Sequence, residues 1–141
     1  MQPYPDIETR IRSSFARQGL MTTLGARLTH IAPGEVVIEL DYGEHITQQH
    51  AFVHGAAIAA IGDTACGYAA LTLLPEDAEV LTVEYKINFV APASGTKFRA
   101  KGMAKKPGRT LTVCTGDVFT ISAEGEKLIA TILATMMRVA T

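Results

Sequence analysis

The sequence predicts an α+β fold in which a curved antiparallel sheet wraps around one long central helix. A run of small and apolar residues from 51 to 74 contains His54 and Asp63, so it fits a buried helix better than a membrane span. Alternating apolar and polar segments lie on both sides of this run. With 141 residues, 48% of them hydrophobic, the chain suits one domain over residues 1–141.

The N-terminal segment predicts a helix that ends near Gly19, because apolar residues recur every four positions from residue 7 to residue 15. Two strands follow, over residues 24–31 and 35–40. Apolar and polar side chains alternate in the second strand, and Pro33-Gly34 between the two is typical of a hairpin turn. This part of the chain therefore predicts one helix and two paired strands.

The central helix extends from about His54 to Leu73, and Pro75 just beyond it is typical of a helix end. Alternating side chains then predict four consecutive strands, over about residues 81–89, 96–105, 111–121 and 127–138. Short turns between them favour an antiparallel meander. This order of elements predicts an α+β fold of the hot-dog kind, with the N-terminal helix added to it.

The last strand predicts self-association. Apolar residues occupy both alternating sets of positions between Leu128 and Met137, so both faces of this strand favour burial. The chain's own central helix covers only one face of the sheet. We therefore expect a homo-oligomer, either a homodimer or a dimer of dimers that forms a homotetramer.

Asp63 is the one carboxylate within the small and apolar run. At 3.6 residues per turn it shares a helix face with alanine and glycine residues, while bulkier residues such as Ile58 and Tyr68 lie opposite. The small face permits close approach by a substrate or by a second backbone. A carboxylate is costly to bury there without a hydrogen-bonding partner or a catalytic role. Asp63 is therefore either catalytic or a hydrogen-bonded residue at an oligomer interface.

The start of the central helix predicts a site for a developing negative charge. Gly55 brings its backbone N–H close to a ligand, and the helix dipole favours an anion there. The alternative is an ordinary helix start with the His54 imidazole as a capping or orienting group. Eight residues separate Gly55 from Asp63, roughly 12 Å along one axis, so the two groups can serve one carbonyl only from different chains. A twofold dimer would then hold two equal composite sites.

Four features of the sequence together resemble a known family. They are Gln48, the Phe-Val-His-Gly stretch at 52–55, Asp63 nine residues after His54, and the segment 85–92. In this combination, over nearly the whole chain, the sequence resembles the phenylacetyl-CoA (PaaI-like) branch of the hot-dog acyl-CoA thioesterases.

The resemblance implies an enzyme that hydrolyses an acyl-CoA thioester to a free acid and coenzyme A. By that likeness Asp63 is the catalytic carboxylate, as general base or as nucleophile, and the Gly55 N–H polarises the thioester carbonyl. Gln48 would hold the water or the carbonyl, and His54 would orient this loop. Thr82 would add a hydroxyl near the acid of the opposite chain. Water activation is slightly preferred over an anhydride intermediate at Asp63.

The anionic coenzyme A requires cations. Lys105, Lys106 and Arg109 surround a turn between two predicted strands, with Arg99 and Lys101 on the preceding strand. Asn88 is a further predicted contact of coenzyme A. The alternative is a solvated basic edge that blocks strand pairing. No other cofactor is expected, since coenzyme A is part of the substrate.

Charge and motif content exclude several other classes. Thirteen Lys and Arg against fourteen Asp and Glu give a net charge of −1, which argues against nucleic acid or an anionic membrane as a partner. His45, His50, His54 and Asp63 have no known metal-ligand spacing, so no metal is expected. No targeting segment is apparent in residues 1–17, which favours the cytoplasm.

Two rival functions remain open. A non-catalytic acyl-CoA-binding module would keep the pocket without needing Asp63, although sensors of this fold carry a DNA-binding segment for which 141 residues are expected to leave no room. A hot-dog acyl-thioester dehydratase or hydratase would use a histidine as base. Free thiol identifies a thioesterase, whereas an enoyl product identifies a dehydratase.

Overall fold

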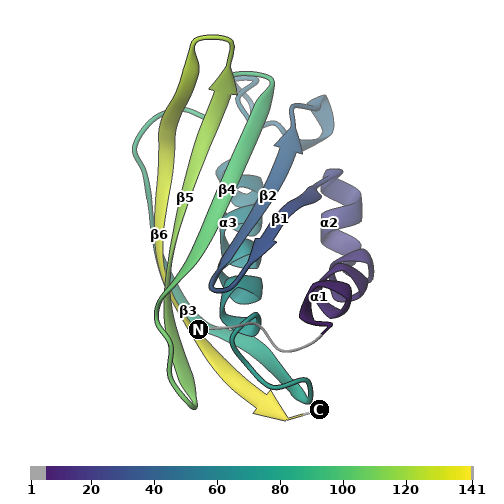
Figure 1. Ribbon diagram of the computed structural model, residues 1–141. Helices are drawn as coiled ribbons and strands as arrows, with labels where there is room; N and C mark the ends of the chain where they lie inside the picture. The colour runs from purple at the N-terminus through teal and green to yellow at the C-terminus, as the bar shows by residue number, and fades with distance from the viewer. Residues whose placement is uncertain (1–5, 141) are drawn as a thin grey trace.

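The structure, a computed structural model, describes residues 6–140. The helices are α1 (Ile7–Ala16), α2 (Gly19–Leu24), the short 3₁₀ helix η1 (Glu44–Ile46) and the central α3 (Gly55–Leu71). The strands are β1 (Arg27–Ala32), β2 (Glu35–Asp41), β3 (Ala78–Phe89), β4 (Lys97–Lys106), β5 (Leu111–Ser122) and β6 (Gly125–Ala140). Figure 1 shows α3 against one face of the curved sheet, with α1 and α2 beside the β1 edge.

The six strands form one antiparallel sheet in the order β1-β2-β4-β5-β6-β3. After β2 the chain crosses the face of the sheet as α3 and returns as β3 at the opposite edge, beside β6. Strands β4, β5 and β6 then fill the space between β2 and β3. The prediction of the hot-dog fold class is confirmed. The predicted meander of four consecutive strands is wrong for its first strand, because β3 pairs with β6 and not with β4.

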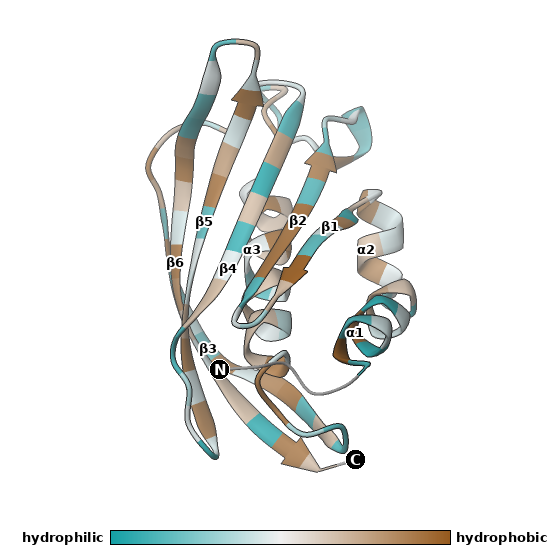
Figure 2. Ribbon diagram, in the orientation of Figure 1, coloured by the Kyte–Doolittle hydropathy of each residue, from teal (hydrophilic) through white to brown (hydrophobic). Residues whose placement is uncertain are grey.

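The core forms where α3 presses on the sheet. Ile58 and Ile61 of α3 and Phe98 of β4 are all buried. A Cβ atom at Gly102 of β4 would overlap the backbone carbonyl of Ala65, so glycine is what allows the helix this close to the strand. Figure 2 shows the matching alternation of hydrophobic and hydrophilic residues along β2 and β4.

Two boundaries in the N-terminal part differ from the prediction. The first helix ends at Ala16. A second helix, α2, occupies Gly19–Leu24, between the helix end expected near Gly19 and the strand expected from Leu24. Met21 and Leu24 are spaced for one helix face and are both buried. Gly25, with φ 72°, ends α2 in the left-handed conformation, so β1 begins only at Arg27.

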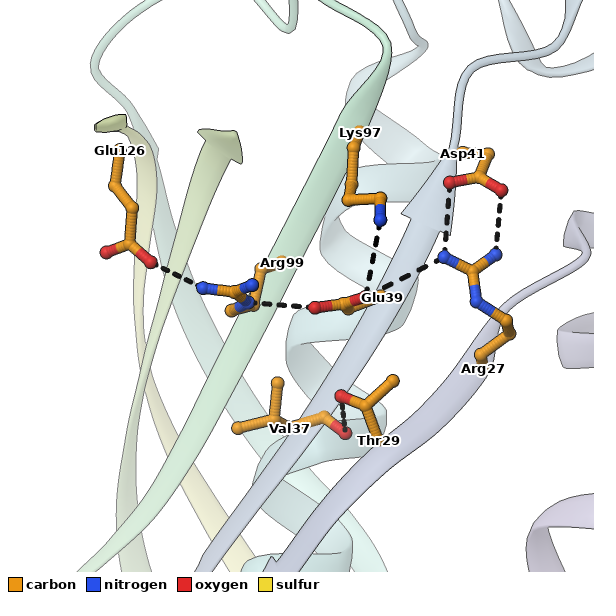
Figure 3. A network of polar contacts seen from close by, with 8 residues as sticks. All are labelled: Arg27, Thr29, Val37, Glu39, Asp41, Lys97, Arg99 and Glu126. Atoms are coloured by element: carbon orange, nitrogen blue, oxygen red, sulfur yellow. Dashed lines mark hydrogen bonds and ion pairs between the residues drawn. The ribbon is translucent and has the colours of Figure 1, made fainter. Parts of the chain in front are cut away.

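The outer face of the sheet carries an ion-pair network at its β1-β2-β4 side (Figure 3). Glu39 accepts a hydrogen bond of 2.9 Å from Arg99, which also pairs with Glu126. Arg27 binds Asp41 through both guanidinium nitrogens, and this hydrogen bonding lowers the pKa of the Asp41 carboxyl. The charges of this region are thus satisfied within the chain.

The opposite side of the sheet is apolar and open. Leu133 and Met137 of β6 are 53% and 37% exposed on the outer face, although Ile132 and Met136 are buried on the inner face. The edge strand β3 exposes further apolar side chains, including Leu81 and Val83. Both faces of β6 are therefore apolar, as predicted, and one of them is uncovered in the single chain.

Candidate active site

Asp63 lies in the middle of α3, on the part of the helix surface that the sheet leaves uncovered, and its side chain is about half-buried. Its Oδ1 atom accepts a hydrogen bond of 2.7 Å from the Thr82 hydroxyl. Burial raises the pKa of Asp63 above its ordinary value, and the Thr82 hydrogen bond lowers it in part. A carboxylate in this state is a better proton acceptor than a solvated aspartate.

Thr82 belongs to the same chain as the carboxylate that it contacts. This corrects the expectation that the hydroxyl serves the acid of the opposite chain. The β3 strand carries a register shift between Thr82 and Glu84, which leaves Thr82 on the helix side of the sheet with its hydroxyl 3.4 Å from Met136 Sδ. The one side-chain hydrogen bond to Asp63 within residues 6–140 thus comes from its own chain.

The start of α3 presents a free backbone donor. His54 is the N-cap residue, and its Nδ1 atom accepts a hydrogen bond of 2.9 Å from the Ala56 N–H. Within residues 6–140 the Gly55 N–H donates to no acceptor. His54 thus has the capping role that the sequence left as one alternative, while Gly55 keeps its N–H available for a ligand.

Gln48 lies in the loop before α3, and its side-chain orientation is fixed. Its Oε1 atom accepts a hydrogen bond from the His50 N–H. The backbone N–H of Gln48 donates to the Phe52 carbonyl at 2.9 Å, which closes the loop around it. Because the amide oxygen is occupied, the side chain offers its NH₂ group to a ligand.

The two groups of candidate residues line separate cavities. Asp63 and Thr82 line a cavity of about 230 Å³ between α1, α3 and β3. Gln48 and Gly55 line another, of about 300 Å³, with Phe89 of β3 in its wall. The two cavities share no lining residue, so a single chain does not bring the acid and the backbone donor to one point.

The predicted contacts of coenzyme A are only partly brought together. Lys105, Lys106 and Arg109 lie around the β4–β5 turn, and their side chains form no ion pair within residues 6–140. Arg138 of β6, which the sequence analysis missed, lines a depression with Arg109. Asn88 pairs with Thr131, seven residues from Arg138 along β6 and thus roughly 23 Å away.

Two other expected phosphate contacts have partners already. Arg99 binds Glu39, and Lys101 lies 3.4 Å from Glu35. The register of β2 and β4 places acidic side chains beside these two cations, and their contact with phosphates stays a prediction. Sequence alternation showed which face they occupy but not which residues lie across from them.

The described residues also bear on metal binding, on the two cysteines and on membrane-spanning helices. Among residues 6–140, no three His, Cys, Asp or Glu side chains gather into a possible ligand set. That the protein binds no metal remains a prediction, which activity after exhaustive chelation tests. Cys66 and Cys114 are buried free thiols, and burial raises the pKa of Cys114 to about 12. In the described part of the chain, no helix has the length and hydrophobicity needed to cross a bilayer.

A family model described as the thioesterase superfamily matches residues 50–125. The chain belongs to the thioesterase superfamily. The match begins in the loop after Gln48, contains Gly55, Asp63 and Thr82, and ends at the start of β6. The family resemblance is therefore confirmed at the level of the thioesterase superfamily.

Solved structures agree with the thioesterase superfamily assignment. A thioesterase family protein from Silicibacter pomeroyi is 44% identical, with a TM-score of 0.93 over 96% of this chain and 99% of that one. The E. coli PaaI protein from the phenylacetic acid degradation operon is 15% identical, with a TM-score of 0.85 over 96% and 94% of the two chains. This second likeness shows the fold alone.

A protein of Saccharolobus solfataricus whose name suggests an esterase is 33% identical over 91 residues, which are 64% of this chain and 64% of the relative. A similarly named protein of Halobacterium salinarum is 30% identical over 95 residues, 64% of this chain and 63% of that one. The chain thus spans less than two thirds of the length of the curated relatives that it matches.

Proposed function

We propose that the protein is an acyl-CoA thioesterase whose active site combines residues of two subunits. The observation that carries the proposal is the half-buried Asp63 carboxylate, which lines a cavity and is held by Thr82. Membership of the thioesterase superfamily supports it. The free Gly55 N–H and the Gln48 amide supply the donors that a tetrahedral oxyanion requires.

The edge strand β3 suggests how two subunits meet. Glu79, Val80 and Thr82, near the start of β3, line the Asp63 cavity, whereas Phe89, at its end, lines the Gly55 cavity. Antiparallel pairing of two β3 edges places the start of one strand beside the end of the other. Such a pairing brings the Asp63 cavity of one subunit to the Gly55 cavity of its partner.

The chemistry then follows from the positions of the donors and the base. Asp63 accepts a proton from a water molecule, whose oxygen attacks the thioester carbonyl carbon. The carbonyl oxygen becomes an oxyanion, which the Gly55 N–H and the Gln48 amide of the partner subunit stabilise. Collapse of this intermediate breaks the carbon–sulfur bond, and the departing thiolate of coenzyme A takes the proton from Asp63. Direct attack by Asp63, which forms an anhydride, is the other route, and trapping of a covalent adduct would identify it.

His54 argues against the dehydratase alternative. A histidine base needs an unprotonated ring nitrogen that faces the substrate, but His54 Nδ1 already accepts the Ala56 N–H. In the neutral ring the other nitrogen carries the proton. We therefore place His54 as the residue that orients the Gly55 loop. The acyl-CoA-binding module without catalysis remains the alternative that replacement of Asp63 tests.

The phosphates of coenzyme A require cations, and the β4–β5 turn has several that form no ion pair with another residue of the range 6–140. Lys105, Lys106 and Arg109 lie there, and Arg138 faces the same depression as Arg109. In the antiparallel dimer the Asn88 end of one β3 strand approaches the start of the partner's β3, which neighbours Arg138 through the pair Val80 and Arg138. Asn88 of one subunit and the cations around the β4–β5 turn of the other would thus face one ligand.

A cytoplasmic location stays a prediction.

The test is release of free thiol from a panel of short, medium, long and aryl acyl-CoAs by the wild-type protein and by Asp63→Asn. We expect thiol release by the wild type and its loss in the variant, with acyl-CoA binding retained. Wild-type protein that binds acyl-CoA without releasing thiol would support the binding module. An enoyl product without thiol would support the dehydratase.

A further inference from the structure

The cavity that contains Asp63 has a polar end formed by three side chains. Tyr68 of α3 is buried, and its hydroxyl lies 2.8 Å from the Ser14 hydroxyl of α1. The side-chain amide of Gln18, in the turn between α1 and α2, donates a hydrogen bond of 2.9 Å to the same Tyr68 oxygen. All three residues line the cavity, so this end of it presents hydrogen-bonding groups rather than apolar side chains alone.

These three groups have unused hydrogen-bonding capacity. A serine hydroxyl, a phenol and an amide together offer four donor hydrogens and several acceptor lone pairs, and the two bonds among them use two donors. The side-chain oxygen of Gln18, Oε1, accepts no hydrogen bond within residues 6–140. A ligand group that reaches this end can therefore both donate and accept.

The charges around the cavity restrict which polar group fits. Asp63 and Glu79 both contribute to its lining. Arg10 lies 3.7 Å from Glu79 and donates to the Pro75 carbonyl, so this cation is already engaged. A carboxylate on the acyl group would enter a cavity that two acids line and in which these groups include no free cation. A neutral hydroxyl or amide carries no such cost.

The size of the cavity restricts the length of the ligand. Its volume of about 230 Å³ is below the roughly 300–1,000 Å³ that is typical of sites for drug-sized ligands. Tyr68 follows Asp63 by five residues, roughly 7.5 Å along the helix axis. Within one subunit, this space is large enough for a short acyl group and small for the long pantetheine arm of coenzyme A.

On these grounds, and resting on the proposed function, we propose a substrate class for the Asp63 cavity. It accepts a short acyl group that carries a neutral hydrogen-bonding substituent at the end remote from the thioester. Ser14, Gln18 and Tyr68 recognise that substituent. They are specificity-determining residues, because they lie at the far end of the acyl group and not at the reacting carbon.

The experiment compares three acyl-CoAs of equal length, hexanoyl-CoA, 6-hydroxyhexanoyl-CoA and adipoyl-CoA, by thiol release. We expect kcat/KM for the hydroxylated substrate to exceed that for hexanoyl-CoA by about threefold to tenfold, the ratio that one net hydrogen bond supplies. Adipoyl-CoA, with a terminal carboxylate, is expected to be the poorest substrate. Ser14→Ala and Tyr68→Phe should bring the hydroxyl preference close to one while hexanoyl-CoA is still hydrolysed.

Ser13→Ala is the matched control, because Ser13 neighbours Ser14 but contacts Arg17 on the exposed side of α1. It should leave the preference unchanged. Equal hydrolysis of hexanoyl-CoA and 6-hydroxyhexanoyl-CoA by the wild type would overturn this inference alone. So would an equal loss of both rates in Ser14→Ala, which would indicate that the contact only holds α1 in place. Failure to hydrolyse any acyl-CoA would instead refute the proposed function, and this inference with it.

Discussion

Replacement of Gly55 by proline removes the N–H that we assign to the oxyanion and preserves the start of α3. Gly55 is the first residue of the helix, where proline is tolerated because its N–H has no acceptor within the helix. His54 has φ −61° and ψ 137°, the extended conformation that a residue before proline prefers. The substitution therefore removes a donor with little change to the backbone.

Gly55→Ala is the matched control, because it adds a Cβ atom and keeps the N–H. In both variants the new Cβ would lie 3.1 Å from Phe89 Cζ and 3.2 Å from Cε1. The Phe89 ring is 53% exposed and can move away, so this contact costs little. Any larger effect of proline than of alanine then reports the lost donor.

The expected size of this difference follows from the electrostatics of an oxyanion site. Loss of one oxyanion donor lowers kcat by about 10²- to 10³-fold, about 2.7–4 kcal/mol. We expect this loss for Gly55→Pro in steady-state thiol release, and a change of only a few-fold for Gly55→Ala. Circular dichroism and thermal unfolding check that both variants fold. Equal kcat values for the two folded variants would refute the role of the Gly55 N–H.

Three further predictions concern the acid and the basic turn. Asp63→Asn should abolish thiol release and stabilise the fold at neutral pH. The raised pKa of Asp63 adds to the stability of the folded protein below pH 3.8, the ordinary pKa of this group. That contribution is lost as the pH rises through the raised pKa, and asparagine does not lose it. In denaturant unfolding, the free energy of unfolding of the variant should exceed that of the wild type by an amount that grows from acid to neutral pH. A difference that does not change with pH would contradict the prediction. Thr82→Val should move the acidic limb of the kcat/KM profile to higher pH and Thr82→Ser should not, since the hydroxyl lowers the pKa of Asp63. Neutralising Lys106 and Arg109 together should raise KM for acyl-CoA several-fold at low salt, whereas Lys127→Gln should not; unchanged KM in the double variant counts against phosphate binding.

The fold could be predicted from the sequence wherever the signal is local. The alanine-rich run and Pro75 defined α3, and alternation defined the strands. Helix α2 was missed, because the six residues from Gly19 to Leu24 are too few to show a clear helical period. The position of β3 at the edge of the sheet could not be predicted from its own residues. It depends on the pairing of the other strands: β4 pairs with β2, β5 pairs with β4, and β6 pairs with β5, so that the second edge of β6 is left for β3.

The candidate site could be predicted in part for the same reason. The motif from Gln48 to Asp63 is local, and it identified the acid and the donors. The contacts of Tyr68 with Ser14 and Gln18 join residues 54 and 50 positions apart, so no local pattern reveals them. The pairing of Arg99 with Glu39 depends on the register of β2 and β4, which alternation alone does not fix.

The shared active site is tested most directly by a hybrid dimer in which one subunit carries Asp63→Asn and the other carries Gly55→Pro. The two chains are co-expressed with different tags, and dimers that hold both tags are purified. In a shared arrangement one of the two sites combines the intact acid of one chain with the intact N–H of the other, so thiol release returns to about half of the wild-type rate. If each chain instead forms its own site, both sites stay impaired, and the hybrid is no more active than the average of the two parent variants.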